Sequence, residues 1–122
     1  MDWQDNFQEH IQLLQQAREA DLTNPFVCHG IVHIFQEAFD LGLMAFREAL
    51  KRDGQGMAAM GSAKELMAAA YEQYLFVEDI WLAMLRDRHG SHDAIEAQVG
   101  RILGTYQDAL AALYDSDADA PR

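Results

Sequence analysis

The segment "RDRHGSH", which begins at Arg86, holds the densest group of side chains suited to chemistry. Metal-independent cleavage of RNA needs a proton shuttle, for which histidine is suited near neutral pH. It also needs a cation for the negatively charged transition state, and arginine provides one by bidentate contact with phosphate oxygens. We therefore predict Arg88 and His92 as candidate catalytic residues, with Arg86, His89 and Ser91 as candidate substrate-binding residues.

The same cluster also fits a solvated polar corner between two helices. The chain carries a formal net charge of −11. That charge opposes broad binding to nucleic-acid backbones, which relies on Lys and Arg to neutralise phosphates. We therefore expect no DNA binding, and expect RNA or nucleotide binding only through this local basic cluster.

A second histidine group, His29 and His33, has a spacing that places both rings on one helix face, with Glu37 one turn later. Two imidazoles at this spacing are able to bind a metal. However, the chain has no HExxH motif, and exposed or interfacial histidines share the same spacing. We therefore predict no metal site here.

Two other motifs are incomplete. Asp115, Asp117 and Asp119 begin like a calcium loop, but Ala120 stands where the loop needs glycine. The Gly-Ser pair before Ala63 matches the turn of a nucleotidyltransferase, but residues 70–78, shortly downstream, contain no Asp-x-Asp pair to hold magnesium. We expect no nucleotidyl-transfer site and, because no glycine-rich phosphate loop is present, no cofactor.

Helices must carry all these candidate residues, because the apolar residues of the chain recur at helical spacing throughout. The pattern predicts an all-α fold, a four- or five-helix antiparallel up-and-down bundle. We expect one domain over residues 1–114 and an acidic disordered tail over residues 115–122. The predicted helices cover about residues 2–19, 25–52, 62–73, 77–88 and 92–114.

Several helix ends are marked by specific residues. Asn24 is a favourable N-cap, and Pro25 suits the first helical position. Ser62 and Glu65 have the spacing of a capping box, in which each side chain bonds the other residue's backbone. Gly90 is expected to end the helix that carries the basic cluster.

The compartment is predicted from composition. The lone Cys28 excludes an internal disulfide framework and fits a reducing cytoplasm. No apolar run is long enough to span a bilayer, and the polar, acidic N-terminus is unlike a secretory signal. We expect a cytoplasmic protein without membrane contact.

Three segments together resemble a known family. "DIWLAML" followed by "DRHGSHD" resembles its segment W-L-x-M-L-x-D-R-N-x-x-S-H. "FQEAFDLGL" resembles F-E-x-T-F-E-L-A-W, and "GSAKELMAAAY" resembles x-S-P-R-E-V-I-R-E-A-F. The spacing of the segments also agrees over about residues 4–114. The chain is identified on these residues as similar to the nucleotidyltransferase substrate-binding proteins of the nucleotide-binding HEPN superfamily.

The resemblance implies a helical bundle that forms a homodimer and pairs with a separately encoded minimal nucleotidyltransferase. That partner would hold the magnesium carboxylates, and the helical chain would be its accessory, substrate-binding subunit. Many relatives form toxin–antitoxin pairs in which the helical protein is a metal-independent endoribonuclease. The positions matching its catalytic arginine and histidine are Arg88 and His92, with Arg86 as an alternative arginine.

The chain departs from the family pattern at the cluster itself. His89 replaces the usual Asn, and the three residues between Arg88 and His92 make a shorter spacing than usual, whereas Arg86 falls within the usual range. Ala94 replaces a tyrosine that partner enzymes modify. Expected basic or aromatic residues are also replaced, by Ile34, Leu43, Met44 and Ala68.

Three functional hypotheses follow from these residues. The chain is an accessory subunit of a nucleotidyltransferase, a HEPN-type ribonuclease toxin, or a helical interaction protein whose site has decayed. The lost basic residues lower the positive charge available for phosphate and so favour the first and third hypotheses over the second.

Overall fold

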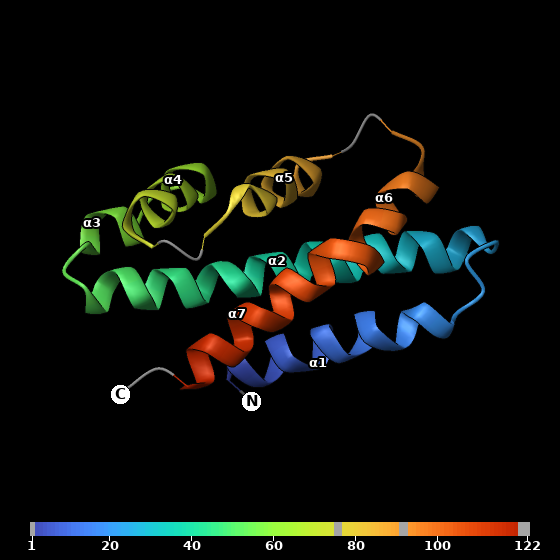
Figure 1. Cartoon of the computed structure of the whole chain (residues 1–122), viewed down its shortest axis with the longest axis horizontal. Coiled ribbons are helices and arrows are strands. Elements are labelled where there is room, and N and C mark those ends of the chain that lie inside the picture. Colours follow the sequence, from blue (N-terminus) through green and yellow to red (C-terminus); the bar gives the residue numbers. More distant parts are fainter. Residues whose placement is uncertain (1, 75–76, 91–92, 120–122) are drawn as a thin grey trace.

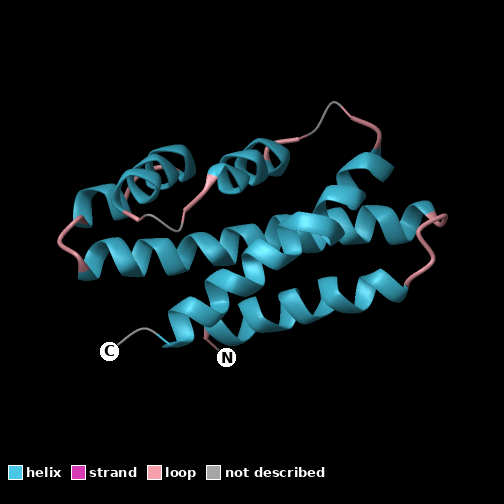
Figure 2. Ribbon diagram, in the orientation of Figure 1, coloured by secondary structure: helices cyan, strands magenta, loops and turns pink. Residues whose placement is uncertain are grey.

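The computed structural model describes residues 2–74, 77–90 and 93–119, with side chains up to residue 115 in the last range. These residues form helices and connecting loops, without strands, as Figure 2 shows. The predicted all-α helical bundle is therefore confirmed. The elements are α1 (Trp3–Gln16), η1 (Ala17–Glu19), α2 (Pro25–Arg52), α3 (Gly56–Ala59), α4 (Ala63–Gln73), α5 (Asp79–Arg88), α6 (Ile95–Arg101), η2 (Ile102–Tyr106) and α7 (Gln107–Asp119).

Helix α2 is the axis of the bundle. Helices α1 and α7 lie along one side of it, while α3, α4 and α5 lie along the other (Figure 1). The chain runs out along α1, returns along α2, runs out again through α4 and α5, and returns through α6 and α7. Helices α1, α4, α5, α6 and α7 all contact α2. This central position explains why α2 is apolar on more than one face.

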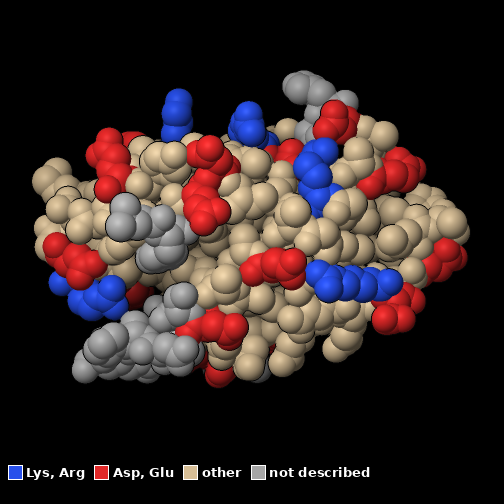
Figure 3. Space-filling model, in the orientation of Figure 1, with Lys and Arg blue, Asp and Glu red and all other residues tan. Residues whose placement is uncertain are grey.

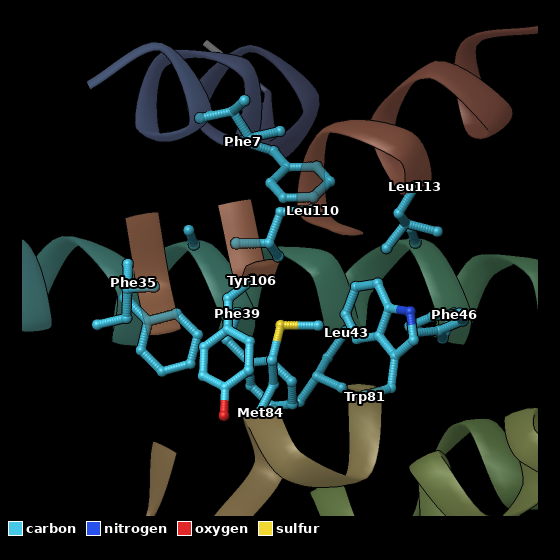
Figure 4. Packing of buried hydrophobic residues seen from close by; sticks show 14 of the residues in the cluster. Phe7, Phe35, Phe39, Leu43, Phe46, Trp81, Met84, Tyr106, Leu110 and Leu113 are labelled. Atoms are coloured by element: carbon cyan, nitrogen blue, oxygen red, sulfur yellow. The ribbon is translucent and has the colours of Figure 1, made fainter. Parts of the chain in front are cut away.

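The core is built around aromatic side chains of α2. Phe35 stacks on Tyr106, with ring centroids 5.4 Å apart. Phe39 and Phe46 both contact Trp81 of α5, with centroid distances of 6.1 and 5.0 Å. Figure 4 shows these rings gathered between α2, α5 and the last helix. Aromatic packing therefore fixes α5 and the last helix against the same stretch of α2.

The predicted helix starts at Asn24 and Ser62 are both present. The Asn24 side chain accepts a hydrogen bond from the Phe26 backbone N–H at 2.9 Å, and Pro25 is the first helical residue. The Ser62 hydroxyl accepts the Glu65 backbone N–H at 3.2 Å. The capping box differs in its second half, because the Glu65 carboxylate accepts from the Ser62 hydroxyl at 3.0 Å.

The last helix differs from its prediction at both ends. It begins at Ile95 rather than near residue 92, and α7 continues through Asp119. The structure describes residues 115–119 as helical, and the expected disorder of residues 115–122 stays a prediction. Before Pro121 this stretch contains no glycine or proline to stop a helix. Residues 120–122 lie outside the described residues.

A π-helical turn, η2, interrupts the last helix, which the sequence predicted to be continuous. The Leu103 carbonyl in this turn accepts hydrogen bonds from Nε and Nη2 of Arg18, at 3.2 and 2.9 Å. Arg18 also lies 3.4 Å from Asp108. A π turn departs from the regular hydrogen bonding of an α-helix, and Arg18 supplies donors to a carbonyl within it.

A histidine that was not singled out in the sequence, His10, connects α1 to α2. Its Nδ1 lies 2.7 Å from the Asn6 carbonyl, and its Nε2 lies 2.7 Å from Oε2 of Glu37. The other Glu37 oxygen lies 3.0 Å from Nε2 of His33. Because a carbonyl and an ionised carboxylate only accept hydrogen bonds, both ring nitrogens of His10 must carry hydrogen. His10 is therefore a cation in this arrangement.

The pKa values of the pair follow from these contacts. Burial lowers the pKa of His10, but the hydrogen bonds to Glu37 and Asn6 and the negative charge of Glu37 outweigh burial, so the pKa is raised above 6.5. The hydrogen bond from His10 is the main cause that lowers the pKa of Glu37 below 4.5.

We predict that the His10–Glu37 pair stabilises the fold most between about pH 4.5 and 6.5. The His10 contribution is complete below its unfolded pKa and is lost as pH rises through the raised folded pKa. The Glu37 contribution is complete above its unfolded pKa and is lost as pH falls through the lowered folded pKa. Urea unfolding of wild type and His10→Gln should therefore differ more at about pH 5.5 than at about pH 8.5.

His29→Gln is the matched control, since His29 is exposed on the same helix as Glu37. It should leave the pH dependence of unfolding unchanged. An equal destabilisation of His10→Gln at both pH values would contradict the prediction.

Candidate functional site

The basic cluster lies at the C-terminal end of α5. Arg86, Arg88 and His89 occupy its last turn, and Gly90, at φ +121°, follows as the predicted stop. Positive φ at this position favours glycine, because other residues adopt it with strain. The remaining predicted site residues, Ser91 and His92, lie outside the described residues.

Arg88 is already engaged by a carboxylate of α2. Its Nε and Nη2 donate to the two oxygens of Asp40 at 3.0 and 2.8 Å, forming a bidentate pair. The hydrogen bonds that Arg88 donates to Asp40 are the main cause that raises the pKa of Arg88 above its usual value. A phosphate that bound Arg88 through the same two donors would have to displace Asp40. The predicted catalytic arginine is thus a link between α5 and α2.

Arg86 and His89 are exposed instead. Among the described residues, no ion pair involves either of them. Arg86 is therefore the cation of this turn that remains open to an incoming anion.

Asp87, between the two arginines, points in another direction and is buried, at 9% relative exposure. Its Oδ2 accepts from Arg101 Nε at 2.8 Å and from the Tyr106 hydroxyl at 2.7 Å. Its Oδ1 lies 3.3 Å from Arg101 Nη2, and its backbone carbonyl accepts from the Gln98 side chain at 3.3 Å. A buried carboxylate is stable only with such partners.

The π turn explains how Arg101 and Tyr106 reach one carboxylate. Residues five apart in an α-helix lie about 140° apart around the axis, on different faces. The wider i→i+5 turn of a π-helix brings such residues nearly into line. The turn η2 spans Ile102–Tyr106, directly after Arg101, so it places both side chains on the side that faces α5.

The charge of Asp87 also affects its two donors. Its hydrogen bond is the main cause that raises the pKa of Arg101 above its usual value. Burial, followed by the hydrogen bond to Asp87, raises the pKa of Tyr106 to about 12. Both donors therefore stay protonated at neutral pH.

A pocket of about 420 Å³ lies beside this network, and Arg86, Asp87, Asp93, Arg101 and Tyr106 are among the residues that line it. Arg101 also pairs with Asp93, at 2.8 Å. Two arginines and two aspartates thus offset one another around the pocket. Figure 3 shows the wider surface, where cationic side chains form small separate groups among acidic ones. Such a pocket suits hydrogen bonding to a small polar group better than concentrated binding of phosphates.

The side chains of His29, His33 and Glu37 do not converge on one point as metal ligands would. Glu37 instead bonds His33 and His10, as described above. Within the part of the chain that the structure describes, no group of three or more suitable side chains is arranged to hold a metal ion. Nor does this part contain a helix long and apolar enough to cross a bilayer.

Sequence reasoning missed Asp40, Asp87 and Arg101 as partners of the cluster. One signal is present in the sequence, because Tyr106 stands at helical spacing from the apolar Ile102 and Leu103, and a buried hydroxyl needs a hydrogen-bond partner. The pattern gave no means to identify that partner.

No family model, curated protein or solved structure matches the chain. The resemblance drawn from the three sequence segments therefore stays a prediction.

We predict that Asp87→Asn destabilises the fold by about 2 kcal/mol, because the change removes the buried negative charge that pairs with Arg101 and weakens the hydrogen bonds from Arg101 and Tyr106. Asp93→Asn is the matched control, because Asp93 is the other carboxylate paired with Arg101 and its own side chain is 59% exposed. It should cost less than about 1 kcal/mol. Urea unfolding followed by circular dichroism measures both, and equal losses would contradict a special role for Asp87.

Proposed function

We propose that the chain is the helical, substrate-binding subunit of a two-component minimal nucleotidyltransferase and acts as a homodimer. The proposal rests on the three sequence segments that resemble this family and on the lack of an Asp-x-Asp pair in residues 70–78. The transfer chemistry would then belong to a separate partner that holds magnesium.

The observation that carries the choice of a binding role over ribonuclease activity is the Arg88–Asp40 pair. A ribonuclease needs a cation available to the transition-state phosphate. Arg88 already uses two of its donors on Asp40, and Arg101 is held by Asp87 and Asp93. The positive charge of this corner is therefore largely compensated within the chain.

Ribonuclease activity is the second candidate, and one observation favours it. Arg86 is exposed and lines the pocket, and its distance in sequence from His92 matches the family spacing. In this alternative, Arg86 would bind phosphate and His92 would transfer the proton.

We predict that tagged chain isolated from its native cells retains a small protein in stoichiometric amount. Mass spectrometry should identify in it a Gly-Ser turn and an Asp-x-Asp pair. An unrelated acidic helical bundle with the same tag controls for adventitious capture. Recovery of the homodimer alone, or of RNA, would count against the two-component proposal.

A second prediction separates binding from cleavage. Purified chain with a chelator present should cleave single-stranded RNA no faster than its His92→Ala variant, because Arg88 is paired with Asp40. Asp40→Asn should weaken the pairing of Arg88 and increase RNA binding. Arg88→Gln is the control, because it removes the cation and should show no such increase. Cleavage by the wild type that both His92→Ala and Arg86→Ala abolish would establish the ribonuclease instead.

A further inference from the structure

Two large apolar side chains stand exposed at the opposite end of α2 from its N-cap. Met57 lies in the short helix α3 and is 91% exposed, and Met60 is the C-cap of that helix and is 82% exposed. Residues three apart lie on the same face of a helix. The two methionines therefore form a small apolar surface, which we call the methionine patch.

The methionine patch borders a pocket of about 590 Å³. The rest of the pocket is lined by Lys51, Gly54, Gln55, Gly56 and Ala58. A Cβ built on Gly54 or Gly56 would meet nothing within 4 Å, so the space above this loop is open. Methionine is flexible and polarizable, and exposed methionines adapt to the apolar side chains of many partners.

The local charge at this pocket is cationic, in contrast to the chain as a whole. The last carbonyls of α2 are occupied, since those of Ala49, Leu50 and Lys51 accept backbone N–H groups of the following loop. The Lys51 ammonium lies 3.9 Å from Glu48, at the outer limit of an ion pair. Lys51 is thus only weakly paired at the pocket edge, and an incoming carboxylate is able to replace Glu48 as its partner.

The surroundings strengthen this contrast. Between residues 47 and 64 stand four of the nine Lys and Arg residues and two acidic residues, Glu48 and Asp53, so this stretch is net positive in a chain with a net charge of −11. Charges beyond about 8 Å are largely screened at physiological ionic strength, so the nearest charges decide what docks. Apolar area flanked by Lys51 suits a partner that combines apolar side chains with carboxylates.

We propose that the methionine patch and its pocket bind an acidic amphipathic helix of a partner protein. Apolar side chains of that helix cover Met57 and Met60, and one of its carboxylates pairs with Lys51. Docking of an amphipathic helix into an apolar groove is a common mode of recognition. An anionic membrane is less suited, because its recognition needs a cluster of several Lys and Arg side chains, and Lys51 is the charged residue that lines this pocket. The proposal stands whether or not the proposed function is correct.

The test uses a synthetic helical peptide of about 15 residues, with leucines at i, i+4 and i+7 and glutamates elsewhere. A matched peptide carries lysines in place of the glutamates. Binding is measured by anisotropy of the labelled peptide and by NMR of methyl-labelled methionines. The acidic peptide should shift the Met57 and Met60 signals, while the signal of the fully buried Met84 stays unchanged.

Three variants test the contacts. Replacing both Met57 and Met60 by Gln should weaken acidic-peptide binding about tenfold, through loss of apolar burial. Lys51→Glu should weaken it about fivefold and strengthen binding of the lysine peptide. Phe26→Gln is the control, because Phe26 is 87% exposed but lies at the other end of α2, and should leave binding unchanged.

Several results would overturn the proposal. These are no binding of the acidic peptide, equal binding of the lysine peptide, and equal binding by the double methionine variant. Met57 and Met60 signals that respond to phosphatidylserine vesicles but not to the peptide would identify a membrane surface instead. Signals that shift with protein concentration alone would identify a second copy of the chain as the occupant.

Discussion

The carboxylate of Asp87 is the interaction on which the geometry of the basic corner depends. It is buried at the end of α5 and takes hydrogen bonds from Arg101 and Tyr106, on the far side of the connecting loop. Because an ionised group is stable in the interior only when its partners are held in place, the end of α5 and the start of the last helix must keep one relative position. This fixed position of the end of α5 also sets the directions in which Arg86 and Arg88 point.

Arg88, next to Asp87, attaches the same end of α5 to a different helix, α2. Successive residues of a helix point about 100° apart. Asp87 therefore faces the last helix while Arg88 faces Asp40 on α2. Two adjacent charges of opposite sign each find a partner on a different helix. Within the segment that holds the basic cluster, Asp87 and Arg88 are therefore residues that attach the end of α5 to the bundle.

Much of the fold could be predicted because it depends on local patterns. The limits of α2, the cap at Ser62 and the stop at Gly90 are set by residues at or next to those positions. The partners of the site could not be predicted in this way. Periodicity places Asp40 and Arg88 on helix faces, but it does not say that residues 48 positions apart will meet. The π turn was missed for a related reason, since Ile102, Leu103 and Tyr106 are buried as a regular helix would also require.

The π turn also has a consequence for how the chain tolerates changes in length. Such a turn accommodates one extra residue within a helix and keeps the helical phase on either side of it. Arg101 and Tyr106 would share a face in an unbroken α-helix if they stood four positions apart, and here they stand five apart. Gly104, between them, is exposed and has no neighbour within 4 Å of a Cβ position. In an evolutionary lineage, the gain or loss of a single codon at this point would therefore alter the turn while sparing the packing of both flanking helices.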